Sequence, residues 1–250
     1  QPLMVGVNSL MFKPSIVCIW PQHLDYPLWR QFIHDNRNRF EHVVVVFTNM
    51  NVYMEGTKVD YRDFLMEVFL QDGITPVDNN EVHAHEDWRD VATRKGLEYA
   101  RSEWVWFMEQ DFVIKSSQFW DELEVIISCS QPDALIYNEQ DRPHPCCWFV
   151  KQEAINKTSK YFGVERDKSD HFGKFYEELS QVAKVTLFTS KHCAHLGGLS
   201  QNLYLLIMGE EPNYRIFSFN QYLKDCLTVT VPLHSDFRDL VNWYFDDKWK

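Results

Sequence analysis

Short apolar runs alternate with segments that carry apolar residues at helical spacing along the first part of the chain. Two runs rich in β-branched residues, Ser15–Trp20 and His42–Thr48, are predicted to be strands, and Leu28–Phe40 between them an amphipathic helix. Runs that are apolar at every position, such as VVVVF, are typical of parallel strands covered by helices on both faces. The pattern therefore begins as strand, helix, strand.

The same alternation continues to about the last quarter of the chain. It predicts helices at Tyr61–Gln71, Asp87–Ala100, Ser117–Ser128, Gln152–Thr158 and Phe172–Leu179, and strands at Ile74–Val77, Ser102–Met108, Ala134–Asn138, Cys146–Val150 and Lys184–Thr189. This order predicts an α/β fold with a doubly wound, mostly parallel central sheet flanked by helices, in which ligands bind at the carboxyl ends of the strands. We expect one domain, 1–250, with halves 1–115 and 116–250.

Composition and charge narrow the class of protein. The net charge of −11 argues against duplex nucleic acid as a partner, because such binding relies on clustered Lys and Arg, whereas a small anion remains possible if a metal ion supplies positive charge. The sequence shows no apolar run of the roughly 20 residues that a membrane helix needs. The six cysteines form no CxxC pair. We therefore expect reduced cysteines and a cytoplasmic enzyme.

Two carboxylates follow a strongly apolar strand in the segment WVWFMEQD. Residues at positions i and i+2 of an extended chain share a side, so Glu109 and Asp111 are expected to face one spot at the rim of the sheet. Carboxylates held together repel each other unless a cation lies between them, and Mg²⁺ or Mn²⁺ is suited to bridge them to a diphosphate. The alternative is a solvated acidic turn that caps the next helix.

The segment before this strand carries a family resemblance. Arg94, Leu97 and Ala100 are spaced along a predicted helix that leads into the strand ending in Glu109-Gln110-Asp111. Over residues 1–115 this resembles the GT-A nucleotide-sugar glycosyltransferases, in which such a helix precedes a strand ending in an Asp-x-Asp motif. Glu109 stands where that motif has its first Asp, and Lys95 where Asn is usual.

The resemblance implies a nucleotide-diphosphate sugar as donor, a hydroxyl group as acceptor, and Mn²⁺ or Mg²⁺ as cofactor. Asp111 would hold the ion most directly, with Glu109 the weaker assignment. Trp20 and Pro21 would flank the nucleotide base, and Arg94 would approach the base or the diphosphate.

The resemblance also implies a general base on a loop that leads into a later helix, in enzymes that invert the anomeric centre. Asp170 matches that position best, ahead of Glu177 and Glu178, and it would take the proton from the acceptor hydroxyl. The alternative is that Ser169 or Asp170 caps the helix without chemistry. We favour inversion over retention.

A late histidine would complete the metal site in such enzymes. In HCAHLGG we assign this role to His195 rather than His192, and expect Gly197 and Gly198 to let the backbone approach phosphate. A His-Cys-x-His zinc site is a rival that lacks two further ligands nearby, and a surface loop is the plainer alternative. The segment 141–145 is expected to be a loop that contacts the acceptor.

Three functions remain in view. The first is a metal-dependent glycosyltransferase. The second is a sugar nucleotidyltransferase, which normally has a Gly-rich, basic loop after its first strand, whereas WPQHLDYP has neither Gly nor Lys. The third is a noncatalytic scaffold, suggested by Glu109 and Lys95. The acceptor is left open among a glycan, a protein, a small molecule and a base in DNA.

Overall fold

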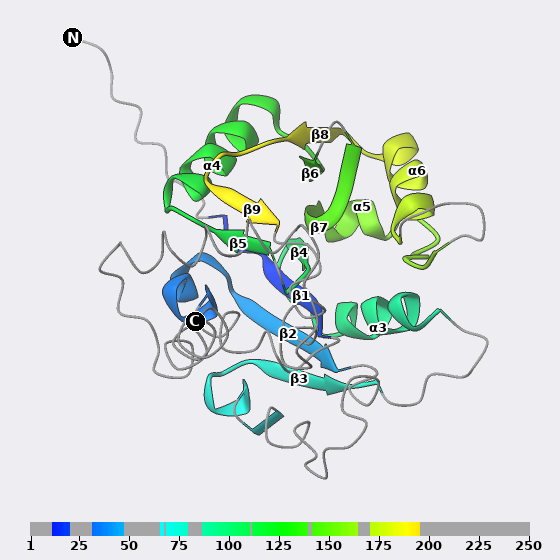
Figure 1. Cartoon of the computed structure of the whole chain (residues 1–250). Coiled ribbons are helices and arrows are strands. Elements are labelled where there is room, and N and C mark those ends of the chain that lie inside the picture. Colours follow the sequence, from blue (N-terminus) through cyan, green and yellow to red (C-terminus); the bar gives the residue numbers. More distant parts are fainter. Residues whose placement is uncertain are drawn as a thin grey trace, which may run out of the picture.

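A computed structural model describes residues 12–20, 32–47, 66–67, 69–79, 87–110, 112–139, 142–164 and 171–195 of the chain. These residues form a central sheet with helices on both faces and a small second sheet beside it (Figure 1). None of the helices in these ranges is both long and apolar enough to cross a membrane.

The central sheet has seven strands in the order β3-β2-β1-β4-β7-β6-β8. Strand β7 runs antiparallel to its neighbours β4 and β6, and the other adjacent pairs are parallel. The α/β fold with a mostly parallel sheet is therefore confirmed. The strands are β1 (Ser15–Trp20), β2 (His42–Phe47), β3 (Thr75–Asp78), β4 (Trp104–Met108), β6 (Ala134–Glu139), β7 (Arg142–Lys151) and β8 (Val185–Phe188).

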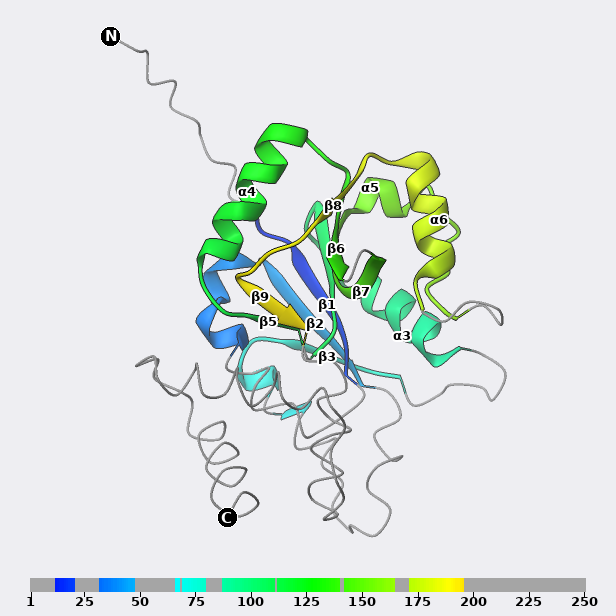
Figure 2. The ribbon, with the colours of Figure 1, turned by 45° about the horizontal axis from the view of Figure 1, so that its top comes forward.

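Helices cover the two faces of the sheet unequally (Figure 2). Helix α4 (Gln118–Ser130) and the short helix η1 (Arg37–Arg39) lie on one side, and α3 (Trp88–Leu97), α5 (Gln152–Ile155) and α6 (Gly173–Val182) lie on the other. Successive residues of a strand point to opposite faces. Trp106 of β4 accordingly packs in the cluster that contains α4, and Phe107 packs in the cluster that contains α6.

Helix α3 approaches the sheet closely enough that one of its positions has no room for a side chain. A Cβ on Gly96 would lie 2.6 Å from Val17 Cγ1 and 3.0 Å from Val46 Cγ2. Those valines belong to β1 and β2, so glycine lets the helix rest directly on the parallel strands. This contact fixes the position of the helix that carries Arg94.

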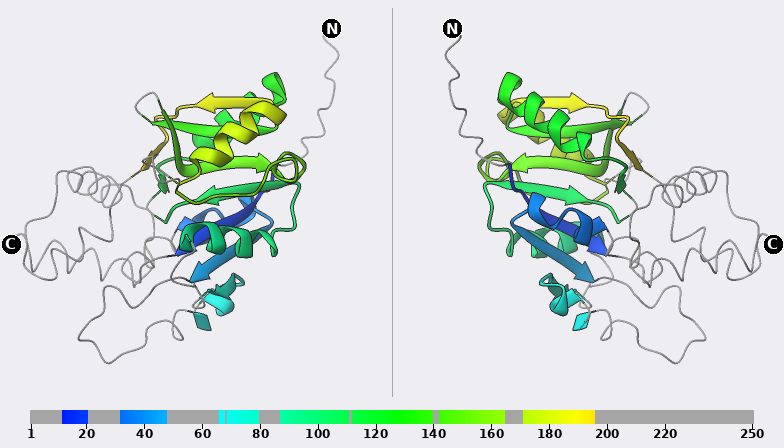
Figure 3. Two further views of the ribbon diagram at one scale, coloured as in Figure 1. Left: turned by 90° about the vertical axis from the view of Figure 1, so that its right-hand side faces the viewer. Right: turned by 90° about the vertical axis from the view of Figure 1, so that its left-hand side faces the viewer.

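The second sheet pairs two short strands that the sequence pattern does not predict. Strand β5 (Phe112–Ile114) follows β4 after a tight turn and pairs antiparallel with β9 (Cys193–His195). Figure 3 shows this pair from two sides, beside the central sheet. The surface-loop alternative for the segment around His195 is therefore wrong, and so is the alternative that the acidic turn caps the next helix, since β5 comes first and Ser117 occupies the N-cap position of α4.

Strand β7 also begins earlier than predicted. The segment 141–145 was expected to be a loop that contacts the acceptor, but its residues 142–145 belong to the strand. The pairing of β7 with β4 runs only from Lys151 to Cys147, so Pro143 and Pro145 fall where no β4 partner needs an N–H donor.

Candidate active site

The carboxyl ends of the parallel strands meet at one rim of the sheet, and Glu109 lies there directly after β4. Strand β7 runs in the opposite direction, so its first residues reach the same rim. The backbone N–H of Glu109 donates to the carbonyl oxygen of Cys146 at 3.1 Å, and the N–H of Phe112 donates to the carbonyl oxygen of Glu109 at 3.2 Å. These two bonds fix the turn that carries the Glu109 carboxylate.

His195 is brought to this carboxylate by the pairing of β5 with β9. It lies opposite Phe112 in the ladder, and its Nε2 is 3.3 Å from Glu109 Oε2. The His195 side chain is only 5% exposed. His192, the histidine we ranked lower, instead contacts Ser116 and Glu122.

His171 approaches the same carboxylate from the segment before α6. Its Nε2 lies 3.4 Å from Glu109 Oε1. The next residue, Phe172, has a positive φ of 70°, which costs a non-glycine residue roughly 1–2 kcal/mol. Burial of its ring against Phe107 and Trp148 offsets that cost, with ring centroids 5.3 and 5.1 Å away. Sequence reasoning missed His171, although it is adjacent to Asp170.

The histidines control the charge of Glu109. Burial by itself raises the pKa of this carboxyl group, but the hydrogen bond with His195 and the charge on His171 outweigh it, and the pKa is lowered to about 2. His144, whose ring centroid lies 4.3 Å from that of His195, adds to the positive field. Glu109 is therefore ionised at any physiological pH.

The spacing of these donors suits a single divalent ion. An octahedral ion with metal–ligand distances of about 2.1 Å places neighbouring donors about 3 Å apart. The 3.3 Å between His195 Nε2 and Glu109 Oε2 is close to that value. Carboxylate oxygen and imidazole nitrogen are both acceptable ligands for Mn²⁺. The pair thus fits the metal that the resemblance implies.

Arg94, the predicted donor contact, lies on α3 with its side chain half exposed, and its Nη2 is 2.8 Å from Asp90 Oδ2. Trp20 ends β1 at the same rim as Glu109. The remaining predicted site residues lie outside the described residues: Pro21, Asp111, Asp170, Gly197 and Gly198. Ser169 and Asp170, the alternative helix caps, also lie outside the described residues, and α6 begins at Gly173 with Phe172 at its N-cap position.

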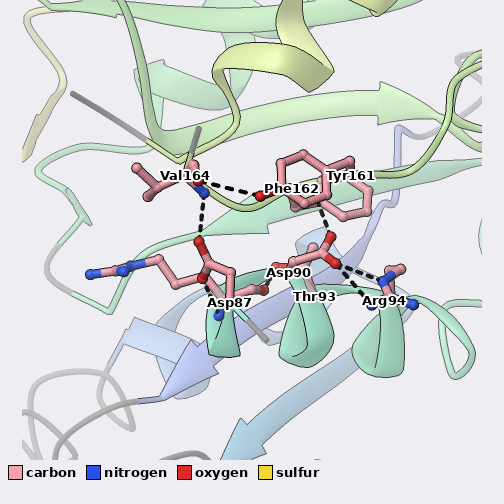
Figure 4. Close-up of polar contacts among 8 residues, drawn as sticks. Asp87, Asp90, Thr93, Arg94, Tyr161, Phe162 and Val164 are labelled. Carbon is pink, nitrogen blue, oxygen red and sulfur yellow. Dashed lines mark hydrogen bonds and ion pairs between the residues drawn. The ribbon is translucent and has the colours of Figure 1, made fainter. Parts of the chain in front are cut away.

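Two carboxylates at the start of α3 hold a distant segment beside the rim (Figure 4). Asp87 Oδ1 caps the helix by accepting from Arg89 N, and its Oδ2 accepts from Val164 N at 2.6 Å. Asp90 Oδ1 accepts from Phe162 N at 2.8 Å while its Oδ2 pairs with Arg94. The chain is thereby fixed just before the segment 165–170.

No protein-family model matches this sequence, and no curated protein matches it. Solved structures do resemble it. Residues 1–349 of TarS from S. aureus align with a TM-score of 0.50 and 12% identity over 93% of this chain and 72% of that chain.

Two further structures are similar to the same extent. The mannosyltransferase PcManGT from Pyrobaculum calidifontis aligns at a TM-score of 0.51 and 10% identity over 92% of this chain and 69% of that one. Glucosyl-3-phosphoglycerate synthase from Mycobacterium tuberculosis aligns with a TM-score of 0.51 and 12% identity over 80% of this chain and 81% of that one. At sequence identities this low, the alignments show only that the folds are similar. The chain therefore has the GT-A-like fold that its sequence predicts.

Proposed function

We propose that this protein is a metal-dependent glycosyltransferase that moves a sugar from a nucleotide-diphosphate donor to a hydroxyl acceptor with inversion. The observation that carries the proposal is the pair formed by Glu109 and His195. An ionised carboxylate and a buried imidazole lie 3.3 Å apart at the carboxyl rim of a GT-A-like sheet. This rim is where open α/β sheets bind their ligands.

Mn²⁺ or Mg²⁺ held by Glu109, His195 and Asp111 would stabilise the negative charge of the departing diphosphate. An ion would bind Glu109 as the deprotonated carboxylate and His195 as the neutral imidazole. The structures of PcManGT and of the mycobacterial synthase contain Mn²⁺, with GDP-Man in the first and UDP in the second. They support a nucleotide-sugar donor and a divalent ion for this chain.

The protein's own groups would bind the donor and activate the acceptor. Trp20 and Pro21 would flank the base, Arg94 would face the base or diphosphate, and Gly197 and Gly198 would let the backbone approach phosphate. Asp170 would accept the proton of the acceptor hydroxyl as the oxygen attacks the anomeric carbon. The contact of the following residue, His171, with Glu109 supports this placement.

Donor binding with and without metal tests the proposal. The chain is stripped of metal with a chelator, and binding of UDP, GDP and their sugar conjugates is measured by calorimetry with and without Mn²⁺. We expect Mn²⁺ to strengthen binding of one nucleotide at least tenfold, and Glu109→Gln or His195→Ala to abolish that gain. His192→Ala is the matched control, since it alters a histidine next to the same strand that contacts Glu122 instead.

Turnover separates a transferase from a scaffold or a nucleotidyltransferase. A transferase releases nucleoside diphosphate from the sugar donor, whereas a nucleotidyltransferase releases pyrophosphate from a nucleoside triphosphate. We expect diphosphate release from the wild-type chain and none from Asp111→Asn. Binding of no donor with either Mn²⁺ or Mg²⁺ would refute the proposal.

A further inference from the structure

A second group of potential metal ligands lies beside the Glu109–His195 pair. His144, Cys146 and His195 each offer one ligand atom, and these three atoms all lie within 4.8 Å of one another. The three side chains come from two strands that are far apart in the sequence, β7 and β9. Two imidazoles and a thiol are ligand types that one zinc ion can bind together.

The fold builds this cluster from the antiparallel course of β7. His144 and Cys146 are two residues apart on that strand and therefore share one of its faces. The carbonyl oxygen of Cys146 accepts from the N–H of Glu109, which ties this part of β7 to the rim. Strand β9 then places the ring of His195 with its centroid 4.3 Å from that of His144.

The cluster is shielded from water. Cys146 is fully buried, His144 is 8% exposed, and the His195 side chain is 5% exposed. Each of the three residues already interacts with other groups of the protein, for example His144 Nδ1 with the N–H of Cys146 at 3.3 Å, and a bound cation would replace some of these interactions. Burial also lowers the entropy that is lost when the ligands are fixed around an ion.

The donor set selects a soft or borderline ion. Thiolate and imidazole are ligands that favour Zn²⁺, whereas Mg²⁺ and Mn²⁺ prefer oxygen. A tetrahedral zinc ion with ligand distances of about 2.0–2.3 Å holds its donors roughly 3.3–3.8 Å apart. The three atoms, now within 4.8 Å of one another, would thus move closer by at most about 1.0–1.5 Å. A fourth position would remain for water or a ligand.

The surroundings match those of zinc histidines. A ligating histidine usually gives the N–H of its other ring nitrogen to a carboxylate, which orients the ring. Glu109 Oε2 lies 3.3 Å from Nε2 of His195 and could accept in this way if Nδ1 of His195 bound the ion. The rival pattern in the sequence, with Cys193 and His192, is not used, because those residues contact Ser190 and Glu122.

We infer that this chain binds Zn²⁺ through His144, Cys146 and His195. A neutral imidazole has a single ring-nitrogen lone pair, so Zn²⁺ and the proposed donor metal would bind His195 alternatively, and the zinc site has its own further ligands on β7. Binding converts the Cys146 thiol to a thiolate and releases its proton to solvent. Zn²⁺ binding at this site does not depend on a sugar donor or on transfer activity.

Co²⁺ is a spectroscopic probe for the site, because a cobalt–thiolate bond gives a charge-transfer band in the near ultraviolet and tetrahedral Co²⁺ gives strong visible bands. The metal-free full-length chain is titrated with Co²⁺ and then with Zn²⁺. We expect both sets of bands at one Co²⁺ per chain and their loss as Zn²⁺ displaces it. Cys146→Ser should lack the charge-transfer band.

Cys147→Ser is the matched control, since Cys147 is adjacent and equally buried but lies outside the cluster. It should keep the band. If far-UV circular dichroism shows that Cys146→Ser does not fold, His144→Ala replaces it and should lower Zn²⁺ affinity at least tenfold. A wild-type chain without the band, or a band that survives Cys146→Ser, overturns the inference.

The outcome is separable from that of the proposed function. Cys146→Ser should retain Mn²⁺-dependent donor binding, because Cys146 is not assigned to the donor site. If no sugar donor binds, the Co²⁺ bands are still expected. If the Co²⁺ bands are absent, Mn²⁺-dependent donor binding is still expected.

Discussion

The two sides of β4 are built in different ways. On one side, β1, β2 and β3 are all parallel to β4, and each pairs with its neighbour in an unbroken register. On the other side, β7 is antiparallel and its ladder with β6 shifts between Ile136 and Asn138. The parallel side provides a regular frame, while the antiparallel side brings histidines to the rim.

The candidate site combines the two. Glu109 comes from the end of β4, whereas His144, His171 and His195 come from β7, the turn before α6, and β9. A regular frame thus holds the carboxylate, and the irregular side supplies the groups that set its charge. Three tests measure how firmly these sides depend on each other.

The largest effect is expected at Trp106 of β4, which is fully buried and touches both sides. Its ring stacks on Phe149 of β7 at 4.7 Å and meets Phe32, which lies between β1 and β2 in the chain, edge-on at 5.7 Å. Trp106→Ala should lower the free energy of unfolding by about 3–5 kcal/mol, because it leaves a large cavity. Urea unfolding followed by circular dichroism measures this, with the exposed Val125→Ala on α4 as control.

A single, shifted unfolding transition for Trp106→Ala would mean that both sides unfold together. Two separate transitions would show that the two sides of β4 are only loosely joined and unfold as separate units.

The next effect is expected at the contact between α3 and the segment 161–164. Asp90→Ala leaves the buried N–H of Phe162 without its acceptor, which should cost about 1–3 kcal/mol. Hydrogen exchange should show faster exchange of the Phe162 amide, with Asp121→Ala on the exposed face of α4 as a control that leaves this amide protected. Unchanged protection in Asp90→Ala would contradict the contact.

The smallest effect is expected for alanine substitutions at two glycines, Gly96 and Gly163. Gly96→Ala places a methyl group against the stiff side chains of Val17 and Val46, and we expect a loss of about 1–2 kcal/mol after allowing for the better helix propensity of alanine. In Gly163→Ala the methyl group meets the Tyr161 hydroxyl, the end of a movable side chain, and the Asp87 carboxylate, whose displacement would weaken only its hydrogen bonds at the surface of the domain. This substitution should cost less than Gly96→Ala in thermal unfolding. The reverse order would show that the parallel side is the more tolerant.

The sequence predicts the parallel side well, because a strand buried on both faces needs apolar residues at every position. Strand β1 has the predicted bounds, Ser15–Trp20, and β2 differs by one residue. Strands β5 and β9 could not be predicted, since three residues are too few for a period and their pairing depends on tertiary contacts.

The site residues likewise differ in how well the sequence predicts them. Glu109 is predictable because a buried strand leads into it, and His195 followed from the family resemblance. His144 was hidden by prolines that suggest a loop, and His171 by its place before a helix that begins with an unusual Phe172 turn. That these histidines face Glu109 follows only from long-range pairing, which local patterns do not encode.

The hydrogen bonds from residues 162 and 164 to the first turn of α3 have a consequence for how this chain can be divided. A genetic split or a protease cut near residue 115 would leave one fragment with acidic groups lacking their backbone donors, and the other with donors lacking acceptors. We expect neither fragment to be stable alone. Mixed together, the two fragments should reassemble.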